Sequence, residues 1–349
     1  MVPYPLLIEP VQHEAIWGGH ALAERYGKPA QGDANVGESW ECWDEHRILN
    51  GAYAGKTLGD VRRERGRELV GRADPARPFP LLTKFIDARE ALSVQVHPDD
   101  AYAQRVEGQP FGKTESWYVL EARPDASIVL GWKRATTRAE FLERVAIGEL
   151  DDVLRRVPVR AGDSFYLPAG TLHAIGAGIV LFETQQASDL TYRVYDYGRI
   201  GPGGKARPLH VDKAADVLGY RACTAGALRG LTYRLDGLSR TALVAGSHFA
   251  TERVELDDER RGYDLDGVPL VVTALADPIE IEARGTAVQL APYRTAVVPA
   301  ALEVAMLRAQ GESATIVTAA PAIDPELMPR RFARAAVPVA ASTDFLAQF

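Results

Sequence analysis

Between residues 80 and 197 the chain is a series of short segments with strand character, and this series limits the available folds most strongly. The segments are rich in β-branched and aromatic residues, and Gly, Pro and Asp separate them. Many short strands with frequent turns indicate a β-sandwich or barrel with helical additions. The segments are PLLTKFIDA (80–88), LSVQVH (92–97), ESWYVLEA (115–122), ASIVLGW (126–132), DSFYLPAG (163–170), IVLFETQQ (179–186) and LTYRVYDY (190–197).

A second strand-rich block runs from about residue 240 to residue 318 and is rich in Ala and Val but poor in His. We interpret it as a second, smaller β domain without metal chemistry of its own. The predicted division is a first domain over residues 1–235, which holds the candidate site described below, and a β domain over 236–320. Residues 321–349 are then a Pro- and Ala-rich extension, either packed on the surface or loosely ordered.

Helix signals are few. Residues 57–71, 136–157 and 210–219 have helical patterns, and the second begins with a candidate capping box of Thr137 and Glu140. The first domain is therefore predicted to be mainly β with helical insertions.

Composition excludes several classes of function. The 349 residues contain 40 basic and 47 acidic side chains, a net charge of -7, which argues against nucleic-acid or anionic-membrane partners. A local cluster of Lys and Arg could still bind an anionic small molecule. Two cysteines, an N-terminus without a basic leader and no apolar run near 20 residues favour a cytoplasmic protein.

Four polar residues form a candidate metal site. Gln95 and His97 are two residues apart in a predicted strand, so they share one face. His173 follows a turn with Pro168 and Gly170, and Glu115 opens another strand. A small barrel can bring these side chains together in its interior. Two imidazoles, a carboxylate and an amide suit zinc, although manganese, iron or nickel could occupy such a site.

The spacing from Gly162 through Pro168 and Gly170 to His173 resembles the second metal-binding motif of the cupins. We therefore expect a cupin jelly roll, also called a double-stranded β-helix, in the first domain. Four longer stretches together resemble type I mannose-6-phosphate isomerase in its short bacterial form. They are LLTKFIDAREALSVQVHPDD, GKTESWYVL, YLPAGTLHAIGAGIVLFETQQASDLTYRVYDYGR and the set IWGG, ERYG and VGESWE. The resemblance covers most of residues 1–220 and weakens beyond about residue 225.

The resemblance implies an intramolecular oxidoreductase, a zinc-dependent aldose–ketose isomerase. It would interconvert mannose 6-phosphate and fructose 6-phosphate through a cis-enediolate, with one zinc ion per chain. The implied zinc ligands are Gln95, His97, Glu115 and His173. The implied catalytic arginine is Arg193, and the implied pocket lysines are Lys84 and Lys113. The expected partner is a phosphorylated hexose, and the expected assembly is a monomer or a small homo-oligomer.

The identity of the general base stays open at this point. Glu183 and Asp189 are carboxylate candidates, a zinc-bound water is a third, and Lys113 could move protons during ring opening. Lys84, Lys113 and Asp189 are expected to bind substrate, with phosphate as the target of the lysines. Lys84 lies among apolar residues of one strand face, and a lone cation there requires a wet pocket.

The remaining polar candidates are interpreted as structural. They are Trp17, expected to pack an N-terminal arm against the barrel, and His13, His20, His46, His210 and His248, expected to be structural or exposed. The segment 38–41 could reach the site.

Two other functions are compatible with such a metal site. An Fe(II) dioxygenase would more often keep His-x-His and would not need the pocket lysines and Arg193. A sugar-binding cupin would retain the ligands without turnover, so a turnover assay discriminates it from an enzyme.

Overall fold

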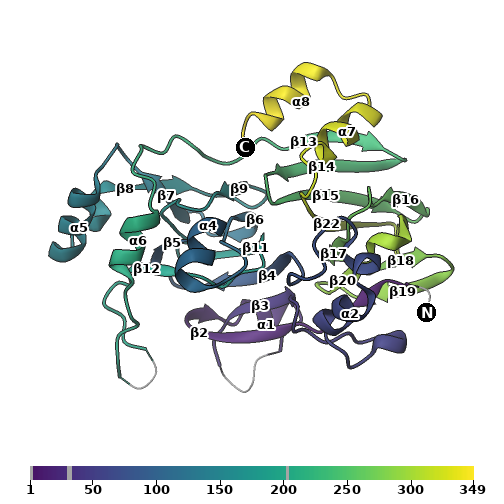
Figure 1. Cartoon of the computed structure of the whole chain (residues 1–349), viewed down its shortest axis with the longest axis horizontal. Helices are drawn as coiled ribbons and strands as arrows, with labels where there is room; N and C mark the ends of the chain where they lie inside the picture. The colour runs from purple at the N-terminus through teal and green to yellow at the C-terminus, as the bar shows by residue number, and fades with distance from the viewer. Residues whose placement is uncertain (1–2, 30–33, 202–203) are drawn as a thin grey trace.

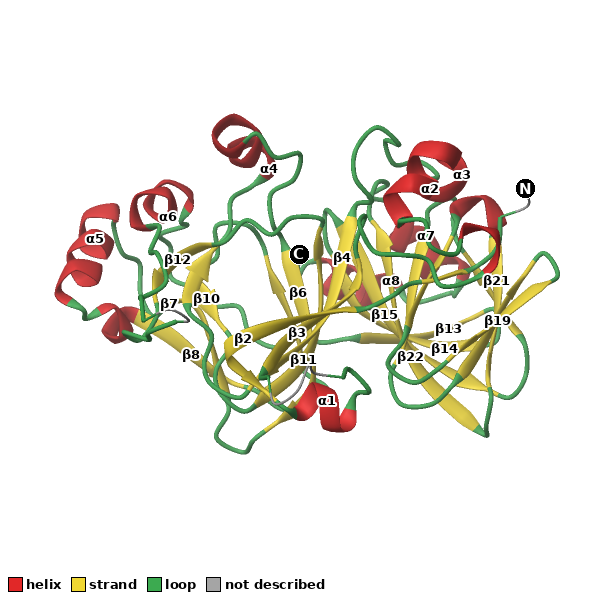
Figure 2. Ribbon diagram, turned by 90° about the horizontal axis from the view of Figure 1, so that it is seen from below, coloured by secondary structure: helices red, strands yellow, loops and turns green. Residues whose placement is uncertain are grey.

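The computed structural model describes residues 3–29, 34–201 and 204–349. The molecule consists of two β-rich halves that lie side by side (Figure 1), and a second view shows the same arrangement with α5 and α6 at one end (Figure 2). Both halves are built from antiparallel sheets.

The first half contains two sheets that face each other. The six-stranded sheet has the order β2 (Val11–Gly19), β3 (Val36–Cys42), β4 (Leu81–Ala88), β11 (Ile179–Gln186), β6 (Glu115–Ala122) and β9 (Ser164–Leu167). The five-stranded sheet has the order β12 (Tyr192–Tyr195), β5 (Val94–Val96), β10 (His173–Ala174), β7 (Ser127–Trp132) and β8 (Leu154–Pro158).

Apolar side chains from both sheets meet between them. Ile86, Trp117 and Leu181 of the larger sheet pack with Ile128 and Leu130 of the smaller one. The residues between these positions point away because side chains alternate along a strand. The predicted cupin jelly roll is therefore confirmed, and its interior is apolar at one end and open at the other.

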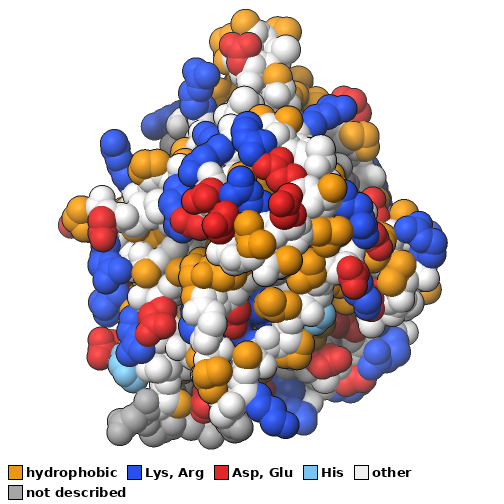
Figure 3. Space-filling view, turned by 90° about the vertical axis from the view of Figure 1, so that its left-hand side faces the viewer, with side chains coloured by type: hydrophobic (Ala, Val, Ile, Leu, Met, Phe, Trp, Pro, Cys, Tyr) orange, Lys and Arg blue, Asp and Glu red, His pale blue; other side chains and the backbone are white. Residues whose placement is uncertain are grey.

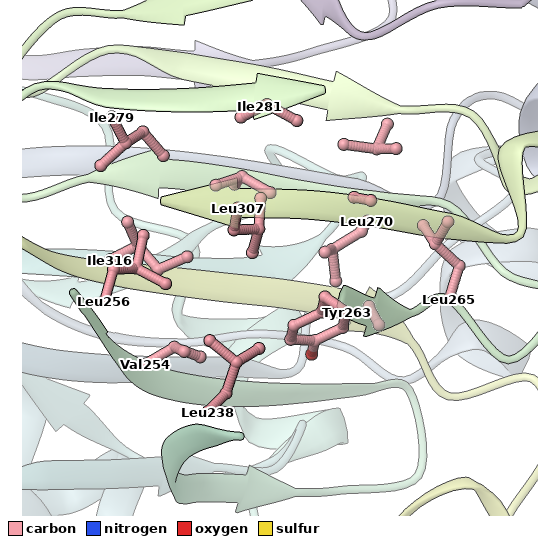
Figure 4. Packing of buried hydrophobic residues seen from close by; sticks show 14 of the residues in the cluster. Leu238, Val254, Leu256, Tyr263, Leu265, Leu270, Ile279, Ile281, Leu307 and Ile316 are labelled. Carbon is pink, nitrogen blue, oxygen red and sulfur yellow. The ribbon is translucent and has the colours of Figure 1, made fainter. Parts of the chain in front are cut away.

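The second half also has two sheets around one core. The seven-stranded sheet has the order β1 (Leu6–Leu7), β20 (Thr295–Val298), β17 (Leu270–Ala274), β22 (Ser313–Pro321), β15 (Phe249–Asp257), β14 (Leu238–Ala245) and β13 (Leu231–Leu235). The four-stranded sheet has the order β16 (Arg261–Asp264), β21 (Val304–Ala309), β18 (Ile279–Ala283) and β19 (Thr286–Leu290). Figure 4 shows Leu, Ile and Val side chains of both sheets pointing toward one another around Tyr263.

Helices cover the outside of the sheets. Helices α5 (Arg138–Ile147) and α6 (Val211–Val217) lie at the far end of the first half, where they pack on the outer face of β5 and β12. Helices α2 (Leu58–Arg65) and α3 (Arg67–Val70) contribute to a core shared by the two halves. The short α1 (Ala21–Arg25) and α4 (Asp100–Tyr102) complete the first half. Shorter helical turns are Gly51–Tyr53, Ala103–Glu107, Leu150–Val153 and Ala300–Leu302.

All seven predicted strand segments of the first half contain a strand, and each of the three predicted helical segments contains a helix. The prediction for 136–157 was wrong beyond α5, because the helix ends at Ile147 before Gly148 and the chain then enters strand β8 at Leu154. The prediction for 57–71 is divided at Gly66 into α2 and α3.

Thr137 accepts a hydrogen bond from the Glu140 amide, so the N-cap at the start of α5 is confirmed, whereas the reciprocal bond of the predicted capping box is not formed among the described residues. The Glu140 carboxylate binds Thr136 and Arg134. Val94 and Val96 pack under α5 and α6, on the face opposite to the barrel interior.

The C-terminal tail is packed on the second half. It forms α7 (Leu327–Arg334) and α8 (Val339–Leu346), and Leu327, Phe332 and Phe345 are buried in the core. Arg331 is also buried and donates hydrogen bonds to Glu252 (2.9 Å) and Asp266 (2.8 Å). Of the two alternatives that the sequence left for the tail, surface packing is therefore the one observed.

Two strands from residues 1–235 belong to the seven-stranded sheet of the second half. β1, at the N-terminus, pairs with β20 of the second half, and β13 pairs with β14. The division at residues 235 and 320 stays a prediction. Among the described residues, every helix is too short or too polar to span a bilayer.

Candidate metal centre and active-site cavity

Strand pairing places Gln95, His97 and His173, three of the four predicted ligands, next to one another. In the five-stranded sheet Gln95 of β5 lies opposite His173 of β10 on one side and opposite Arg193 of β12 on the other. Directly opposite residues in a sheet have their side chains on the same face. His97 follows the end of β5, so Gln95 and His97 reach the site from one segment.

The two imidazoles and Glu115 form a buried cluster. The distance from Glu115 Oε1 to His173 Nε2 is 3.1 Å, and the distance from Glu115 Oε2 to His97 Nε2 is 3.4 Å. His97, Glu115 and His173 each expose 2% of their surface or less. Their potential ligand atoms all lie within 4.8 Å of one another, so the cluster could hold a metal ion. The Gln95 amide lies 3.4 Å from His173 Nε2.

Backbone carbonyls orient both imidazoles. His97 Nδ1 lies 2.7 Å from the Leu190 carbonyl oxygen, and His173 Nδ1 lies 2.8 Å from the Thr171 carbonyl oxygen. A carbonyl only accepts, so each Nδ1 carries the proton and each Nε2 presents a lone pair to the cluster. Burial and the Lys113 cation lower the pKa of His97 to about 3, which keeps this imidazole neutral. Such partners on the far nitrogen are typical of metal-binding histidines.

Glu115 has an ion-pair partner in Lys113 but, among the described residues, lacks the hydrogen bonds that a buried carboxylate normally accepts. Neither oxygen accepts a hydrogen bond within the described residues, although both are buried. Burial opposes its ionisation, but the Lys113 cation holds the pKa of Glu115 well below its usual range. An ionised, buried carboxylate without hydrogen bonds, flanked by two aligned lone pairs, fits a cation.

Lys113 is the nearest cation to the cluster. Its ammonium lies 3.0 Å from Glu115 Oε2 and 3.4 Å from His97 Nε2. Burial works against its charge, but Glu115, Glu183 and Asp189 raise the pKa of Lys113 above its ordinary value.

A second row of polar side chains crosses the six-stranded sheet. Trp40, Lys84, Glu183 and Trp117 are successive cross-strand partners on β3, β4, β11 and β6. The Lys84 ammonium lies 3.1 Å from Glu38 and 3.6 Å from Glu183, and it sits 4.7 Å from the centre of the Trp40 ring. Lys84 is 2% exposed and lines the cavity, as its apolar neighbours in the sequence predict.

Glu183 is held by one hydrogen bond. Trp117 Nε1 donates to its Oε2 at 2.9 Å, whereas no described donor reaches its buried Oε1. Burial and the neighbouring Glu115 charge raise the pKa of Glu183. One oxygen is therefore fixed, and the other is available to exchange a proton.

The candidate metal cluster and the row of side chains on the six-stranded sheet border one cavity of about 690 Å³. Its wall includes Gln95, Glu115, Lys84, Lys113, Glu183, Asp189 and Arg193. Asp189 is exposed, and Arg193 is half-buried. His97 and His173 are not part of the wall and touch it through Glu115. All the predicted site residues therefore lie in this cavity or directly behind it, and their individual roles stay predictions.

Several cavity residues were not predicted. His13 and His210 were interpreted as structural or exposed, yet both line the cavity, His13 as an exposed residue. Arg207 also lines it. Glu38 and Trp40 reach the cavity from β3, which the sequence left as a possibility. Glu38 and Trp40 are two residues apart, and this spacing indicates that they share one face of a strand. Arg207 and His210 lie outside any strand, so no periodic pattern indicated where their side chains point.

Comparisons with known proteins agree with this geometry. Residues 6–130 match the family model for the catalytic domain of type I phosphomannose isomerase. Mannose-6-phosphate isomerase ManA from Bacillus subtilis (strain 168) is 47% identical over 224 residues, which are 62% of this chain and 69% of the relative. The crystal structure of the Bacillus subtilis mannose 6-phosphate isomerase has a TM-score of 0.82 and 31% identity, covering 90% of this chain and 99% of that chain. A zinc-bound mannose 6-phosphate isomerase structure has a TM-score of 0.70 at 14% identity, which shows the fold alone; it covers 91% of this chain and 99% of that one.

A double-sheet barrel with a His–Glu–His cluster at the edge of a polar cavity defines an enzyme of the cupin superfamily with a candidate metal centre. The chain belongs to the type I phosphomannose isomerase family.

Proposed function

We propose that this protein is a zinc-dependent isomerase that interconverts mannose 6-phosphate and fructose 6-phosphate. The observation that carries the proposal is the position of the buried His–Glu–His cluster beside a cavity lined by lysines, arginines and carboxylates. Family membership supplies the substrate class, because the curated relatives carry the name mannose-6-phosphate isomerase.

His97, Glu115 and His173 are proposed to hold one zinc ion through the two Nε2 lone pairs and the Glu115 carboxylate. Gln95 is proposed to complete the set through its amide oxygen. In the structure the amide nitrogen lies 3.4 Å from His173 Nε2 and the oxygen accepts a hydrogen bond from Ser93 (3.3 Å), so the amide group would have to rotate by half a turn to bind the metal. When bound, zinc acts as a Lewis acid that polarises the carbonyl and hydroxyl oxygens of the sugar. A mixed nitrogen and oxygen set suits zinc, and the zinc-bound isomerase of the same fold supports this choice.

The proposed reaction moves one proton between neighbouring carbons. A base removes the C2 proton of the open-chain aldose, and the electron pair forms a cis-enediolate with charge on the C1 and C2 oxygens. A proton then returns to C1, and the hydroxyl proton passes from the C2 oxygen to the C1 oxygen. No external oxidant or reductant is required.

Three residues are proposed to serve this chemistry directly. Arg193 lies beside Gln95 across the sheet, and its permanently charged guanidinium stabilises oxyanion charge. Glu183 is our first choice as base because its Oε1 accepts no hydrogen bond from the described residues and because burial raises its pKa. Lys113 is proposed to donate a hydrogen bond to a sugar oxygen next to the cluster.

The remaining proposals concern binding and context. Asp189, at the exposed side of the cavity, is proposed to bind sugar hydroxyls, and Lys84 is proposed to contact substrate while holding Glu38 and Glu183 in place. The division into domains 1–235 and 236–320 with an extension 321–349 is retained as a proposal. A cytoplasmic location fits the two free cysteines, Cys42 and Cys223.

The test is conversion of mannose 6-phosphate to fructose 6-phosphate by purified protein, after chelation and again after zinc is added. Activity is expected to disappear and to return. Glu183→Gln is the matched catalytic variant, because it keeps shape and zinc content while removing the base. Its turnover is expected to fall by about 10²- to 10⁴-fold.

A folded, zinc-loaded protein that converts no mannose 6-phosphate would contradict the proposal and favour a sugar-binding cupin. Full activity after complete chelation would contradict the role of the metal. Undiminished turnover in Glu183→Gln would move the base to Asp189 or to water.

A further inference from the structure

Lys113 is buried, but its backbone is not part of the strands that order its neighbours. Its ammonium lies 3.0 Å from Glu115 and 3.4 Å from His97, and the residue is 4% exposed. Glu115 is held on both sides, because it opens β6 and pairs with Gln185 of β11 and with Leu167 of β9. Lys113 lies before β6, in the connection from β5, so its position must be set by other contacts.

Basic side chains on the surface do not need such contacts. On the face of the molecule that contains α5 and α6, basic and acidic side chains are interspersed (Figure 3). There Lys213 of α6 pairs with Glu107 while its side chain remains 45% exposed, so it can change rotamer in solvent at little cost. The buried Lys113 side chain has no such freedom, and the position of its ammonium follows that of its backbone.

Two side chains bind the backbone on either side of Lys113. The Gly112 amide donates to Asp100 Oδ1 at 2.7 Å, and the Thr114 amide donates to Gln186 Oε1 at 2.9 Å. Gln186 Nε2 donates in turn to the same Asp100 oxygen at 2.9 Å. Asp100 and Gln186 therefore form one continuous bridge across the backbone that carries Lys113, which we call the 100–186 clamp.

The chemistry of the clamp requires these two residue types. Gln186 accepts from the Thr114 amide and donates to the Asp100 carboxylate, and only a side chain with both functions can do so. Gln186 is 4% exposed, and its own backbone amide donates to the Thr114 carbonyl at 3.1 Å, so β11 carries this half of the clamp. Within the described residues Asp100 forms no ion pair, and both hydrogen bonds of its carboxylate belong to the clamp.

Close backbone packing leaves the segment no alternative path. A Cβ at Gly112 would lie 2.4 Å from the Pro98 carbonyl oxygen, and the Lys113 amide donates to that same oxygen at 2.9 Å. The start and the end of the connection between β5 and β6 are therefore in contact. Since His97 opens this connection and Lys113 lies near its end, the clamp also sets the distance between these two side chains.

We propose that Gln186 and Asp100 are positioning residues that hold the Lys113 ammonium beside the His–Glu–His cluster. Neither residue lines the cavity, so both act through the backbone of residues 112–114. The inference rests on the proposed function, in which Lys113 donates a hydrogen bond to a sugar oxygen. A displacement of about 1 Å in a catalytic group can cost about 10²-fold in rate, so a clamp outside the cavity can control turnover.

The kinetic test is a double-mutant cycle in the zinc-loaded protein. Gln186→Met keeps the length of the side chain but removes both of its hydrogen bonds, and the turnover number is expected to fall by about 10- to 100-fold. The KM and the zinc content are expected to change little, because Glu115 keeps its own strand partners. In Lys113→Met protein the further change Gln186→Met is expected to lower turnover no more, because the clamp acts through Lys113.

Three further variants separate positioning from general stabilisation. Asp100→Asn keeps an oxygen that accepts from Gly112 and Gln186, so it is expected to retain most of the turnover. Asp100→Ala is expected to resemble Gln186→Met, and it takes the place of that variant if Gln186→Met does not fold. Thr57→Ala removes a capping hydrogen bond outside the cavity wall and is expected to leave turnover unchanged.

Hydrogen exchange in the peptide 111–120 separates this inference from the proposed function. Exchange there is expected to rise in Gln186→Met and not in Thr57→Ala, with or without turnover of mannose 6-phosphate. Unchanged exchange in Gln186→Met overturns the clamp. Additive losses of turnover in the Lys113→Met cycle, or equal losses in Asp100→Asn and Asp100→Ala, overturn its action on Lys113 through hydrogen bonds. A wild-type protein without turnover, together with raised exchange in Gln186→Met, would contradict the proposed function and still support the clamp.

Discussion

At the scale of single residues, the candidate metal centre depends on groups that never touch the cavity. The carbonyls of Leu190 and Thr171 fix the tautomers of His97 and His173. Sequence spacing could predict Gln95 and His97, because residues two apart in a strand share a face. It could not predict the carbonyl partners, because every residue has a backbone carbonyl and the residue type does not show which one will accept a hydrogen bond. Arg207 and His210 were missed for a related reason: a loop has no period that shows which way its side chains point.

Glu115 is expected to be required for metal binding. Glu115→Gln keeps the size of the side chain but removes the charge that faces the two imidazoles. Purified Glu115→Gln protein is expected to contain little zinc and to regain little activity when zinc is added, since an ionised ligand is lost. Elemental analysis after dialysis measures this. Glu183→Gln is the control with the same chemical change outside the cluster. Zinc content near one ion per chain in Glu115→Gln would exclude Glu115 as a ligand.

His46 is expected to make stability depend on pH. It is buried, its Nδ1 has no partner within the described residues, and burial together with His13 lowers its pKa to about 4. The neutral form is favoured in the folded state, so its contribution is complete above the unfolded pKa of about 6.5 and is lost as pH falls toward 4. Between pH 7 and pH 5 this amounts to about 2 kcal/mol of unfolding free energy.

Urea unfolding at the two pH values measures the His46 contribution. His97 is also buried and adds to the pH dependence with the same sign, so the wild-type protein must be compared with His46→Gln. The variant is expected to lose about 2 kcal/mol less than the wild type on going from pH 7 to pH 5. Identical losses in the two proteins would show that His46 titrates normally in the folded state.

At the scale of elements, local sequence signals worked where the element carries its own start signal. Thr57 begins α2 with a complete capping box: its hydroxyl accepts from the Asp60 amide, and the Asp60 carboxylate accepts from the Thr57 amide, each at 3.0 Å. The C-terminal helices α7 and α8 lack such a cap, and their sequence is rich in Pro and Ala. Their order comes from Phe332, Phe345 and Arg331, which bind to a distant core. Long-range contacts of this kind are not visible in a local pattern.

The Thr57 cap is expected to stabilise the protein measurably. Thr57→Ala leaves the Asp60 amide without its partner and is expected to lower the unfolding free energy by about 1 kcal/mol. Thr57→Ser retains the hydroxyl and is expected to stay close to the wild type. Urea midpoints of the three proteins measure the effect. If Thr57→Ala and Thr57→Ser were equally stable, the capping hydrogen bond would contribute nothing.

At the scale of the whole molecule, strand β3 joins the cavity to the second half. Glu38 and Trp40 face the cavity, whereas Ser39 and Glu41 face the other way. On that side the Lys28 ammonium binds Glu41 at 2.8 Å and also donates to the Tyr293 carbonyl of the second half. Lys28 and Glu41 are both almost fully buried. This ion pair could not be predicted from the sequence, because its members become neighbours only after the two halves pack together.

Removing one member of this buried pair is expected to destabilise the protein strongly. Lys28→Met leaves the Glu41 carboxylate buried without its counter-charge, at an expected cost of about 3–5 kcal/mol of unfolding free energy. Lys28→Met/Glu41→Gln removes both charges and keeps an acceptor for the Ser39 hydroxyl, so it is expected to recover most of that loss. Urea unfolding of the wild type, Lys28→Met, Glu41→Gln and the double variant gives a double-mutant cycle for this ion pair. Additive losses would show that the two charges do not interact. If the double variant loses much less unfolding free energy than the sum of the two single losses, the ion pair stabilises the packing of β3 against the second half.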